Sequence, residues 1–143
     1  MKAKPFIVGF FALVVLIAAV SAYIAATIDR ADKTVSMLLS PDGKFKAVKT
    51  TVTGGGAAPF CVSGVSVFLA AYAEDYAETR REYEVYSGPC GKFANDEPSP
   101  KVEWQSNTAL QITHVPVAAN AKLPKLRNID VTKSVHVTFA TRE

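Results

Sequence analysis

The two cysteines are the side chains whose chemistry the sequence defines best. Cys61 and Cys90 are the only cysteines of the 143-residue chain. An even cysteine count in an exported domain favours one disulfide, formed in an oxidising compartment. Neither cysteine belongs to a CxxC pair or has a histidine at the spacing of zinc ligands. We therefore expect a structural disulfide, and neither a metal site nor a catalytic thiol.

The two histidines lie in segments that alternate like strands. His136 stands between Val135 and Val137, so we expect its imidazole on the solvated face of a sheet, and we expect the same of His114. If the two strands were neighbours, the imidazoles could meet to bind a metal or to respond to acid pH. Two ligands without a nearby cysteine or carboxylate make an incomplete site, so we predict no metal and no cofactor.

Serines and carboxylates are the remaining candidates for catalysis. Ser63 and Ser66 lie on either side of Gly64, but they lack the G-x-S-x-G arrangement of a nucleophile elbow. Five carboxylates could act in pairs as acid and base in a hydrolysis, although a solvated loop explains them more simply; they are Glu74, Asp75, Glu78, Glu82 and Glu84. We expect a protein that is not an enzyme, and a hydrolase is the least favoured function.

Four tyrosines are the best candidates for contact with a partner. Tyrosine offers a large amphipathic surface at a low entropic cost, which suits it to protein interfaces. The alternative interpretation is that these rings only cover the sheet. The candidate binding residues are Tyr72, Tyr76, Tyr83 and Tyr86.

An uncharged run at residues 5–28 indicates the cellular compartment in which these side chains would lie. It follows Lys2 and Lys4, and a helix of this length would reach ~36 Å, enough to cross a bilayer core. The lysines before the run favour a cytoplasmic N-terminus. We expect a single-pass anchor at residues 1–28 of a bacterial inner membrane protein, and one periplasmic β domain at residues 29–143.

A cleaved signal peptide is the alternative interpretation of the same run. Residues 6–20 would form its apolar region, and Val20-Ser21-Ala22 would be the cleavage site. The apolar character continues to Ile28, which a signal peptide does not need and an anchor does. Both interpretations send the following domain out of the cytoplasm.

The part of the chain after the anchor has the size and charge of one ordinary domain. Its 115 residues suit a single core, and its 14 basic residues nearly balance its 13 acidic ones. The charges of both signs are interspersed, without the basic face of a nucleic-acid-binding domain. We therefore exclude nucleic acid as a partner.

The dominant hydrophobic period after the anchor is two, which is typical of strands. Residues 34–39 and 44–53 predict a hairpin through the turn Ser40-Pro41-Asp42-Gly43, with lysines of the second strand at a solvated edge. Residues 60–71 predict a central strand, and residues 72–82 predict either a short helix or a polar hairpin tip. A strand at residues 83–86 should end in a turn at residues 87–91.

The second half of the domain contains the clearest predicted hairpin. Residues 102–105 and 109–115 form its strands, with Trp104, Leu110 and Ile112 expected in the core. Two further strands are expected at residues 128–132 and 135–141. The total predicts a mainly β fold, a small antiparallel β-sandwich or curved sheet of about seven strands.

Two sequence features carry a family resemblance. Ser40-Pro41-Asp42-Gly43-Lys44 followed by a strand, and Val102-Glu103-Trp104 followed by a bend and Leu110-Gln111-Ile112, resemble the strands of propeller blades. The chain has length for two blades at most, whereas a propeller needs four. It also resembles a group of small uncharacterised bacterial proteins with one N-terminal membrane segment and a domain that begins SPDGK. That resemblance implies no functional residues.

These observations predict an anchored envelope protein whose periplasmic β domain binds another protein. It would act as an accessory subunit of a membrane complex or as an immunity-type inhibitor of a toxin. The alternative is a secreted or anchored module that binds lipid, glycan or cell-wall fragments, which requires an apolar or aromatic-lined cavity.

Overall fold

The computed structural model describes residues 13–22, 31–55, 58–118 and 121–143. The chain divides into two units, residues 1–30 and 31–143, and each is described by itself. In the first unit, residues 13–22 form a helix with exposed side chains, and the rest of the predicted segment 5–28 lies outside the described residues. Within the described ranges, no helix has the length and apolar character that a membrane crossing requires.

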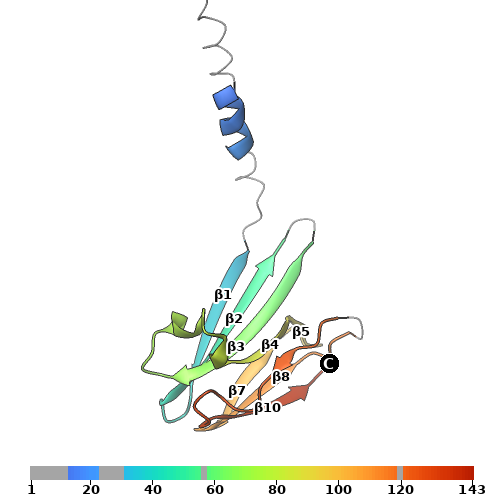
Figure 1. Ribbon diagram of the computed structural model, residues 1–143. Helices are drawn as coiled ribbons and strands as arrows, with labels where there is room; N and C mark the ends of the chain where they lie inside the picture. The colour runs from blue at the N-terminus through green and yellow to red at the C-terminus, as the bar shows by residue number, and fades with distance from the viewer. Residues whose placement is uncertain (1–12, 23–30, 56–57, 119–120) are drawn as a thin grey trace, which may run out of the picture. The chain divides into compact units, whose positions relative to one another are not determined.

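The second unit is built on a five-stranded antiparallel sheet with the order β1-β2-β3-β4-β9 (Figure 1). Its strands are β1 (Asp32–Leu39), β2 (Phe45–Gly54), β3 (Phe60–Leu69), β4 (Glu84–Pro89) and β9 (Lys125–Leu126). The predicted hairpin of residues 34–39 and 44–53 is confirmed, and so is the central position of the strand at residues 60–71. The mainly β class of the fold is therefore confirmed.

The turn between β1 and β2 is held by short polar side chains. The Ser40 hydroxyl accepts the backbone N–H of Phe45 at 3.0 Å and donates to the Asp42 carboxylate at 2.8 Å. This donation from Ser40 lowers the pKa of Asp42. Gly43 has a φ of 69°, which explains why glycine occupies this position.

A three-stranded sheet with the order β10-β8-β7 covers one face of the larger sheet. It contains β7 (Lys101–Ser106), β8 (Ala109–His114) and β10 (His136–Thr141), and a third sheet pairs β5 (Gly91–Lys92) with β6 (Pro98–Ser99). The predicted hairpin of residues 102–105 and 109–115 is confirmed. The expected antiparallel pairing is found in the other ladders, but β10 runs parallel to β8, with His136 opposite Ala109. The long connection after β8 returns the chain to the start of that strand.

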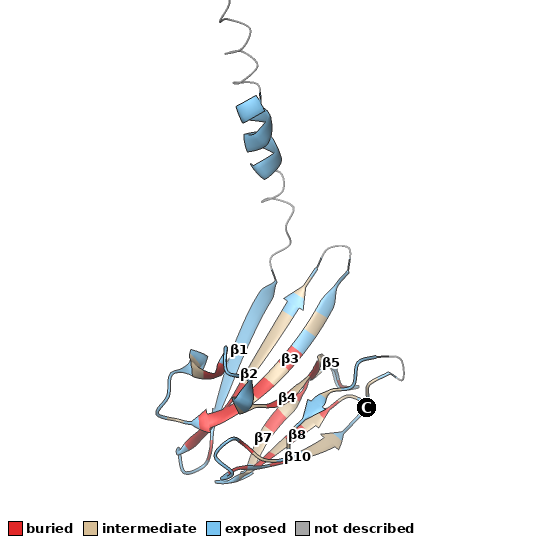
Figure 2. Ribbon diagram, viewed as in Figure 1, coloured by how far each residue is buried: buried red, intermediate tan, exposed pale blue. Residues whose placement is uncertain are grey.

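The core lies between the five-stranded and three-stranded sheets (Figure 2). Alternate residues of the strands point into it, so polar residues between them face outward. Trp104 packs against it while Leu110 and Ile112 are fully buried, as the hairpin pattern predicted. The buried members are Phe45, Ala47, Val65, Val67, Val85, Tyr86, Val102, Leu110, Ile112, Val135 and Val137.

A second, smaller cluster lies on the opposite face of the large sheet. Phe68 and Val48 of the sheet pack there against Ala77. Residues 72–82, expected as a helix or a hairpin tip, form two 3-10 turns, η1 (Glu74–Ala77) and η2 (Arg81–Tyr83). Lys46 is only 5% exposed beneath this segment, so the prediction that the lysines mark a solvated edge is wrong for it. β2 is an inner strand, and the Lys46 ammonium donates to the Tyr72 carbonyl.

Two boundaries differ from those expected from the sequence. Residues 87–89 continue β4, whereas we expected a turn, because the ladder with β3 extends through Gly88 to Pro89. Residues 128–132, expected as a strand, turn around the buried Asp130. Its carboxylate accepts backbone N–H groups that a strand would offer to a neighbour, those of Thr132, Ser134 and Val135.

Candidate functional site

The histidines belong to neighbouring strands, yet their imidazoles are kept apart. Because β8 and β10 run parallel, His136 pairs with Ala109 at one end while His114 pairs with Thr141 at the other. His136 is exposed as expected, but His114 is buried, so its predicted place on the surface is wrong. It follows Leu110 and Ile112 on the inner face of β8, and its Nδ1 donates to the Val115 carbonyl at 2.9 Å. The described residues contain no group of three metal-ligating side chains.

The serines and carboxylates do not converge on one point. Ser63 is buried on the inner face of the large sheet, where its hydroxyl meets that of Thr51 at 2.8 Å, and Ser66 lies on the opposite face. Glu78 pairs with Lys33, and Glu84 lies 3.5 Å from the ammonium of Lys125. Ser63, Glu78 and Glu84 therefore each have a neighbouring side chain that explains their position.

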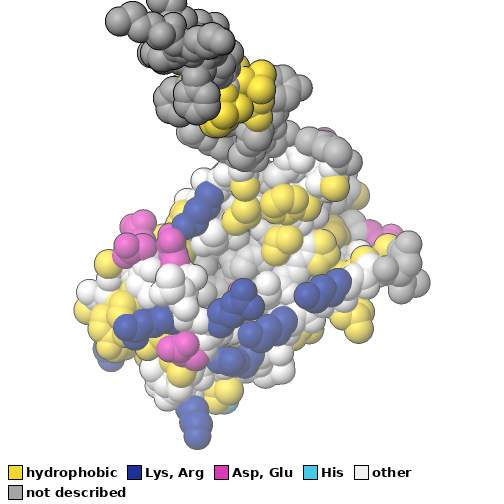
Figure 3. Space-filling view, turned by 45° about the horizontal axis from the view of Figure 1, so that its top comes forward, with side chains coloured by type: hydrophobic (Ala, Val, Ile, Leu, Met, Phe, Trp, Pro, Cys, Tyr) yellow, Lys and Arg dark blue, Asp and Glu magenta, His cyan; other side chains and the backbone are white. Residues whose placement is uncertain are grey.

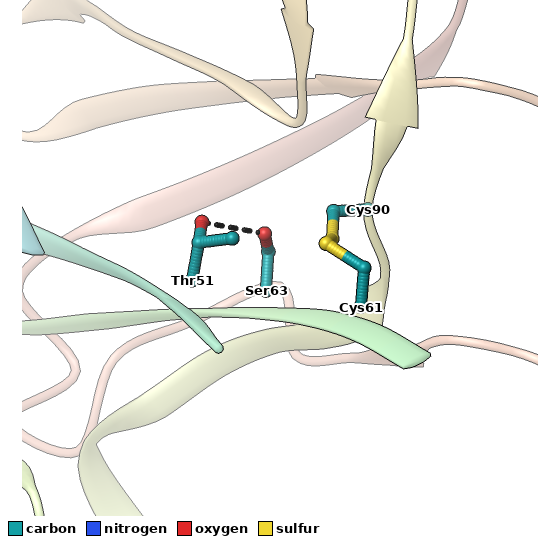
Figure 4. Close-up of a disulfide and its surroundings, with 4 residues drawn as sticks. All are labelled: Thr51, Cys61, Ser63 and Cys90. Carbon is teal, nitrogen blue, oxygen red and sulfur yellow. Dashed lines mark hydrogen bonds between the residues drawn. A yellow bond between two sulfur atoms is a disulfide. The ribbon is translucent and has the colours of Figure 1, made fainter. Parts of the chain in front are cut away.

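Cys61 and Cys90 form the predicted disulfide (Figure 4). Cys61 lies near the start of β3, and Cys90 directly follows β4, the adjacent strand, so their Cα atoms are 5.4 Å apart. The Cys90 N–H also donates to the Cys61 carbonyl at 3.3 Å. The bridge fastens two strands of the large sheet where the ladder between them ends.

Three of the four candidate tyrosines share one aromatic cluster. The rings of Tyr72 and Tyr76 stack at 4.3 Å between centroids, and Tyr83 meets Tyr76 edge to face at 5.4 Å. The Arg80 guanidinium lies over the Tyr76 ring and donates to its hydroxyl at 2.8 Å. Tyr86 lies apart from them, buried in the main core against His114. Tyr86 is therefore a core residue in this structure and lies away from the surface cluster.

A groove of about 580 Å³ crosses the outer face of the large sheet. Small residues of β2, β3 and β4 form its floor, and η1 and η2 border it. The face seen in Figure 3 carries acidic, basic and apolar side chains next to one another. The groove itself has charged walls and no aromatic lining; those charged residues are Lys33, Glu74, Glu78, Arg81, Glu84 and Lys122. Such walls do not match the apolar cavity that a lipid requires.

The strand β1 is exposed along all eight residues. Among the described residues it pairs only with β2, so its other side is a free edge of the sheet. The Ser40 N–H donates to the Phe45 carbonyl, and hydrogen-bonded pairs alternate along an antiparallel ladder. The even-numbered residues therefore bond to β2, and backbone groups of the odd-numbered residues point to the free edge; these are Lys33, Val35, Met37 and Leu39.

A smaller cavity of about 260 Å³ lies beside this edge, on the inner side of β1. Ser36 and Leu38 of β1 line it, together with Lys49 of β2 and residues of the β6–β7 region, which are Glu97, Pro98, Lys101 and Val102. The indole N–H of Trp104 on β7 donates to the Leu38 carbonyl at 3.1 Å. This bond shows that β7 lies next to β1 on the side where the cavity lies. We call the cavity the edge pocket.

Lys49, expected with the other lysines of its strand at a solvated edge, is a partly buried residue of the edge pocket. Its ammonium donates to the Pro100 carbonyl at 3.2 Å, and burial lowers its pKa. The inward direction of the Lys49 side chain could have been predicted from the sequence. Side chains alternate along a strand, and Lys49 is an even number of residues from Phe45 and Ala47, whose side chains face the core. The free edge of β1 could not have been predicted in this way, because the residues of a strand do not specify which strands lie next to it.

Comparisons of the chain with protein-family models, with curated proteins and with solved structures gave no match.

Proposed function

We propose that the β domain is a protein-binding module that receives an extended segment of its partner as an added strand at the free edge of β1. The observation that carries this proposal is the exposure of β1 along its whole length. Backbone hydrogen bonds to such an edge supply affinity, and the side chains next to it supply specificity. An accessory subunit and an immunity-type inhibitor would both work in this way.

The edge lacks the features by which strands are usually protected. Proteins block exposed edges with proline, with bulges or with charges along the strand. β1 contains no proline, its register with β2 is unbroken, and its charged residues, Asp32 and Lys33, both stand at its start. Val35, Met37 and Leu39 are 41%, 40% and 53% exposed on its outer face. These apolar side chains support a role in contact.

We further propose that the N-terminal segment anchors this module at the periplasmic side of a bacterial inner membrane. The uncharged run at residues 5–28, the lysines before it and the disulfide support this location. Mass spectrometry of the protein purified from membranes should show residues 1–22 retained. A mature chain that begins at Tyr23 would contradict the anchor and leave a freely diffusing module.

A proline substitution distinguishes the free edge from the rest of the strand. The Met37 N–H points to the edge, so Met37→Pro removes a donor for the added strand and leaves the ladder with β2 intact. The probe is an acetylated, amidated octapeptide with lysine at both ends, alternating valine and threonine within, and one central glutamine among the threonines. We expect Met37→Pro to weaken binding of this probe to the full chain in detergent by about tenfold or more.

Met37→Ala is the matched control, because it shortens the same side chain and keeps the N–H. We expect it to bind the probe within about threefold of the unchanged protein, since a single exposed apolar contact contributes little. Amide hydrogen exchange should slow on binding at the odd-numbered residues of β1. Slowing that is confined to other strands, or equal binding by both variants, would refute strand addition.

Hydroxyl groups in the groove support a second candidate, binding of a glycan or cell-wall fragment, although the groove lacks the apolar or aromatic lining that we expected for such a ligand. Its floor carries hydroxyl groups that could bond to a polar ligand, those of Thr50, Ser66 and Ser87. Titration with soluble cell-wall fragments, followed by NMR, tests it directly. Shifts restricted to these three residues, with the β1 amides unchanged, would favour this function over strand addition.

A further inference from the structure

The edge pocket lies where a strand added to β1 would place its inward side chains. Ser36 and Leu38, the inward residues of β1, form one wall of the pocket. Side chains of an added strand alternate in the same way as those of β1, so one inward side chain of the partner would stand next to this wall. A volume of about 260 Å³ has room for one such side chain.

The chemistry of the pocket is both apolar and cationic. Leu38, Pro98 and Val102 supply apolar walls that would contact the methylene groups of an entering side chain. Two ammonium groups, those of Lys49 and Lys101, border the same space. A side chain with a short apolar stem and an anionic end matches these surroundings.

Ion pairs account for the other charges of the pocket. Lys101 lies 3.2 Å from the Glu103 carboxylate, and Glu97 lies 2.8 Å from the Arg142 guanidinium. Lys49 pairs with no carboxylate in the described part of the chain, and its protein contact is the neutral Pro100 carbonyl. The positive charge of Lys49 is therefore not balanced by a carboxylate in this partly buried site. The lowered pKa of Lys49 agrees with an ammonium that has lost water without gaining an anion.

We propose that the segment bound by β1 carries a glutamate or aspartate at its inward position, and that this carboxylate enters the edge pocket and pairs with Lys49. The inference rests on the proposed strand addition and names the chemistry of the partner. A charge-assisted hydrogen bond in a partly buried pocket is stronger than a neutral one, and it would set the register of the added strand. The outer face of the same segment would carry apolar residues opposite Val35 and Met37.

The test compares the octapeptide with glutamine at its central inward position with the same peptide carrying glutamate there. We expect the glutamate peptide to bind the full chain about tenfold more tightly, because only its carboxylate balances the Lys49 charge. Lys49→Met should abolish this preference and leave binding of the glutamine peptide unchanged. The matched control is Lys101→Met, which removes the ammonium that Glu103 already neutralises and should retain the preference.

The outcomes separate this inference from the proposed function. Equal binding of the two peptides, or a preference that survives Lys49→Met, overturns the carboxylate site while strand addition stands. Absence of slowed exchange in β1 with either peptide overturns strand addition itself. If Lys49→Met does not fold, Lys49→Gln keeps a donor for the Pro100 carbonyl and gives the same comparison.

Discussion

Among the described residues of this domain, the buried side-chain nitrogen and oxygen atoms have hydrogen-bond partners, with one exception. Asp130 satisfies backbone groups of its own turn, and His114 bonds to the Val115 carbonyl. Tyr86 is 1% exposed, and its hydroxyl is buried without a hydrogen-bond partner in the described part of the chain. A buried hydroxyl that has lost water and gained no partner destabilises the folded state.

Replacing Tyr86 with phenylalanine should therefore stabilise the protein. We expect Tyr86→Phe to raise the free energy of unfolding by about 1 to 2 kcal/mol, measured by urea denaturation at neutral pH. Tyr76→Phe is the control, because its hydroxyl accepts a bond from Arg80 and its loss should give no stabilisation. A loss of stability in Tyr86→Phe would show that the hydroxyl is satisfied in solution.

Burial also raises the pKa of Tyr86, which predicts a pH dependence. The folded state holds the phenolic proton more tightly than the unfolded state does, so this contribution to stability is complete below the unfolded pKa of about 10. It is lost as the pH rises through the higher folded pKa. The urea midpoint should thus fall less steeply above about pH 10 in Tyr86→Phe than in the unchanged protein.

At the scale of single elements, two glycines in adjacent strands differ in the space around them. A Cβ at Gly88 of β4 would stand 2.7 Å from the Tyr86 hydroxyl and 2.9 Å from the Cβ of Pro124. At Gly64 of β3, its nearest neighbour would be the Glu84 carboxylate at 3.4 Å. The first position has no room for a methyl group, whereas the second faces the open groove.

This difference predicts opposite effects of the same substitution. Gly88→Ala should lower the free energy of unfolding by about 1 to 3 kcal/mol, because it overpacks the site beside Tyr86. Gly64→Ala should be neutral or stabilising by up to about 1 kcal/mol, since alanine loses less backbone entropy in a strand than glycine. Chemical denaturation of both variants measures this. Similar losses in both would mean that the packing around Gly88 is not the cause.

Across the whole molecule, the disulfide is the covalent link between distant parts of the sequence. Cys61 and Cys90 enclose a loop with a sequence separation of 29, which contains η1, η2 and β4. Cross-linking a loop of this size lowers the entropy of the unfolded chain, which corresponds to about 3 to 4 kcal/mol of stability. The disulfide therefore stabilises the folded state, in which β3 and β4 are adjacent strands.

Replacing both cysteines with serine should lower the free energy of unfolding by about 3 to 4 kcal/mol. Adding a reductant to the unchanged protein should produce the same loss, whereas the double variant should not respond to reductant. Non-reducing peptide mapping identifies the bridge in protein isolated from cells. Free thiols at both positions there would remove the support that the disulfide gives to a periplasmic location.

Features that depend on neighbouring residues could be predicted from the amino-acid sequence. The turn at residues 40–43, the two hairpins and the central strand follow from local turn residues and from the period of two. The disulfide follows from the cysteine count and the expected compartment. Local preferences suffice here because each pairing joins segments that are close in the chain.

Features that depend on pairing between distant segments became visible in the folded domain and could not be predicted from the sequence. The parallel pairing of β10 with β8 separates His114 from His136, and the strand order leaves β1 at an edge. The ladder between β3 and β4 shifts register between Val65 and Ser66, and Tyr86, which pairs with Val65, lies in the core and away from the other tyrosines. Lys49, Lys101 and Leu38 come together at the edge pocket because two sheets meet there. Such contacts arise from long-range packing, which the alternation within one strand does not specify.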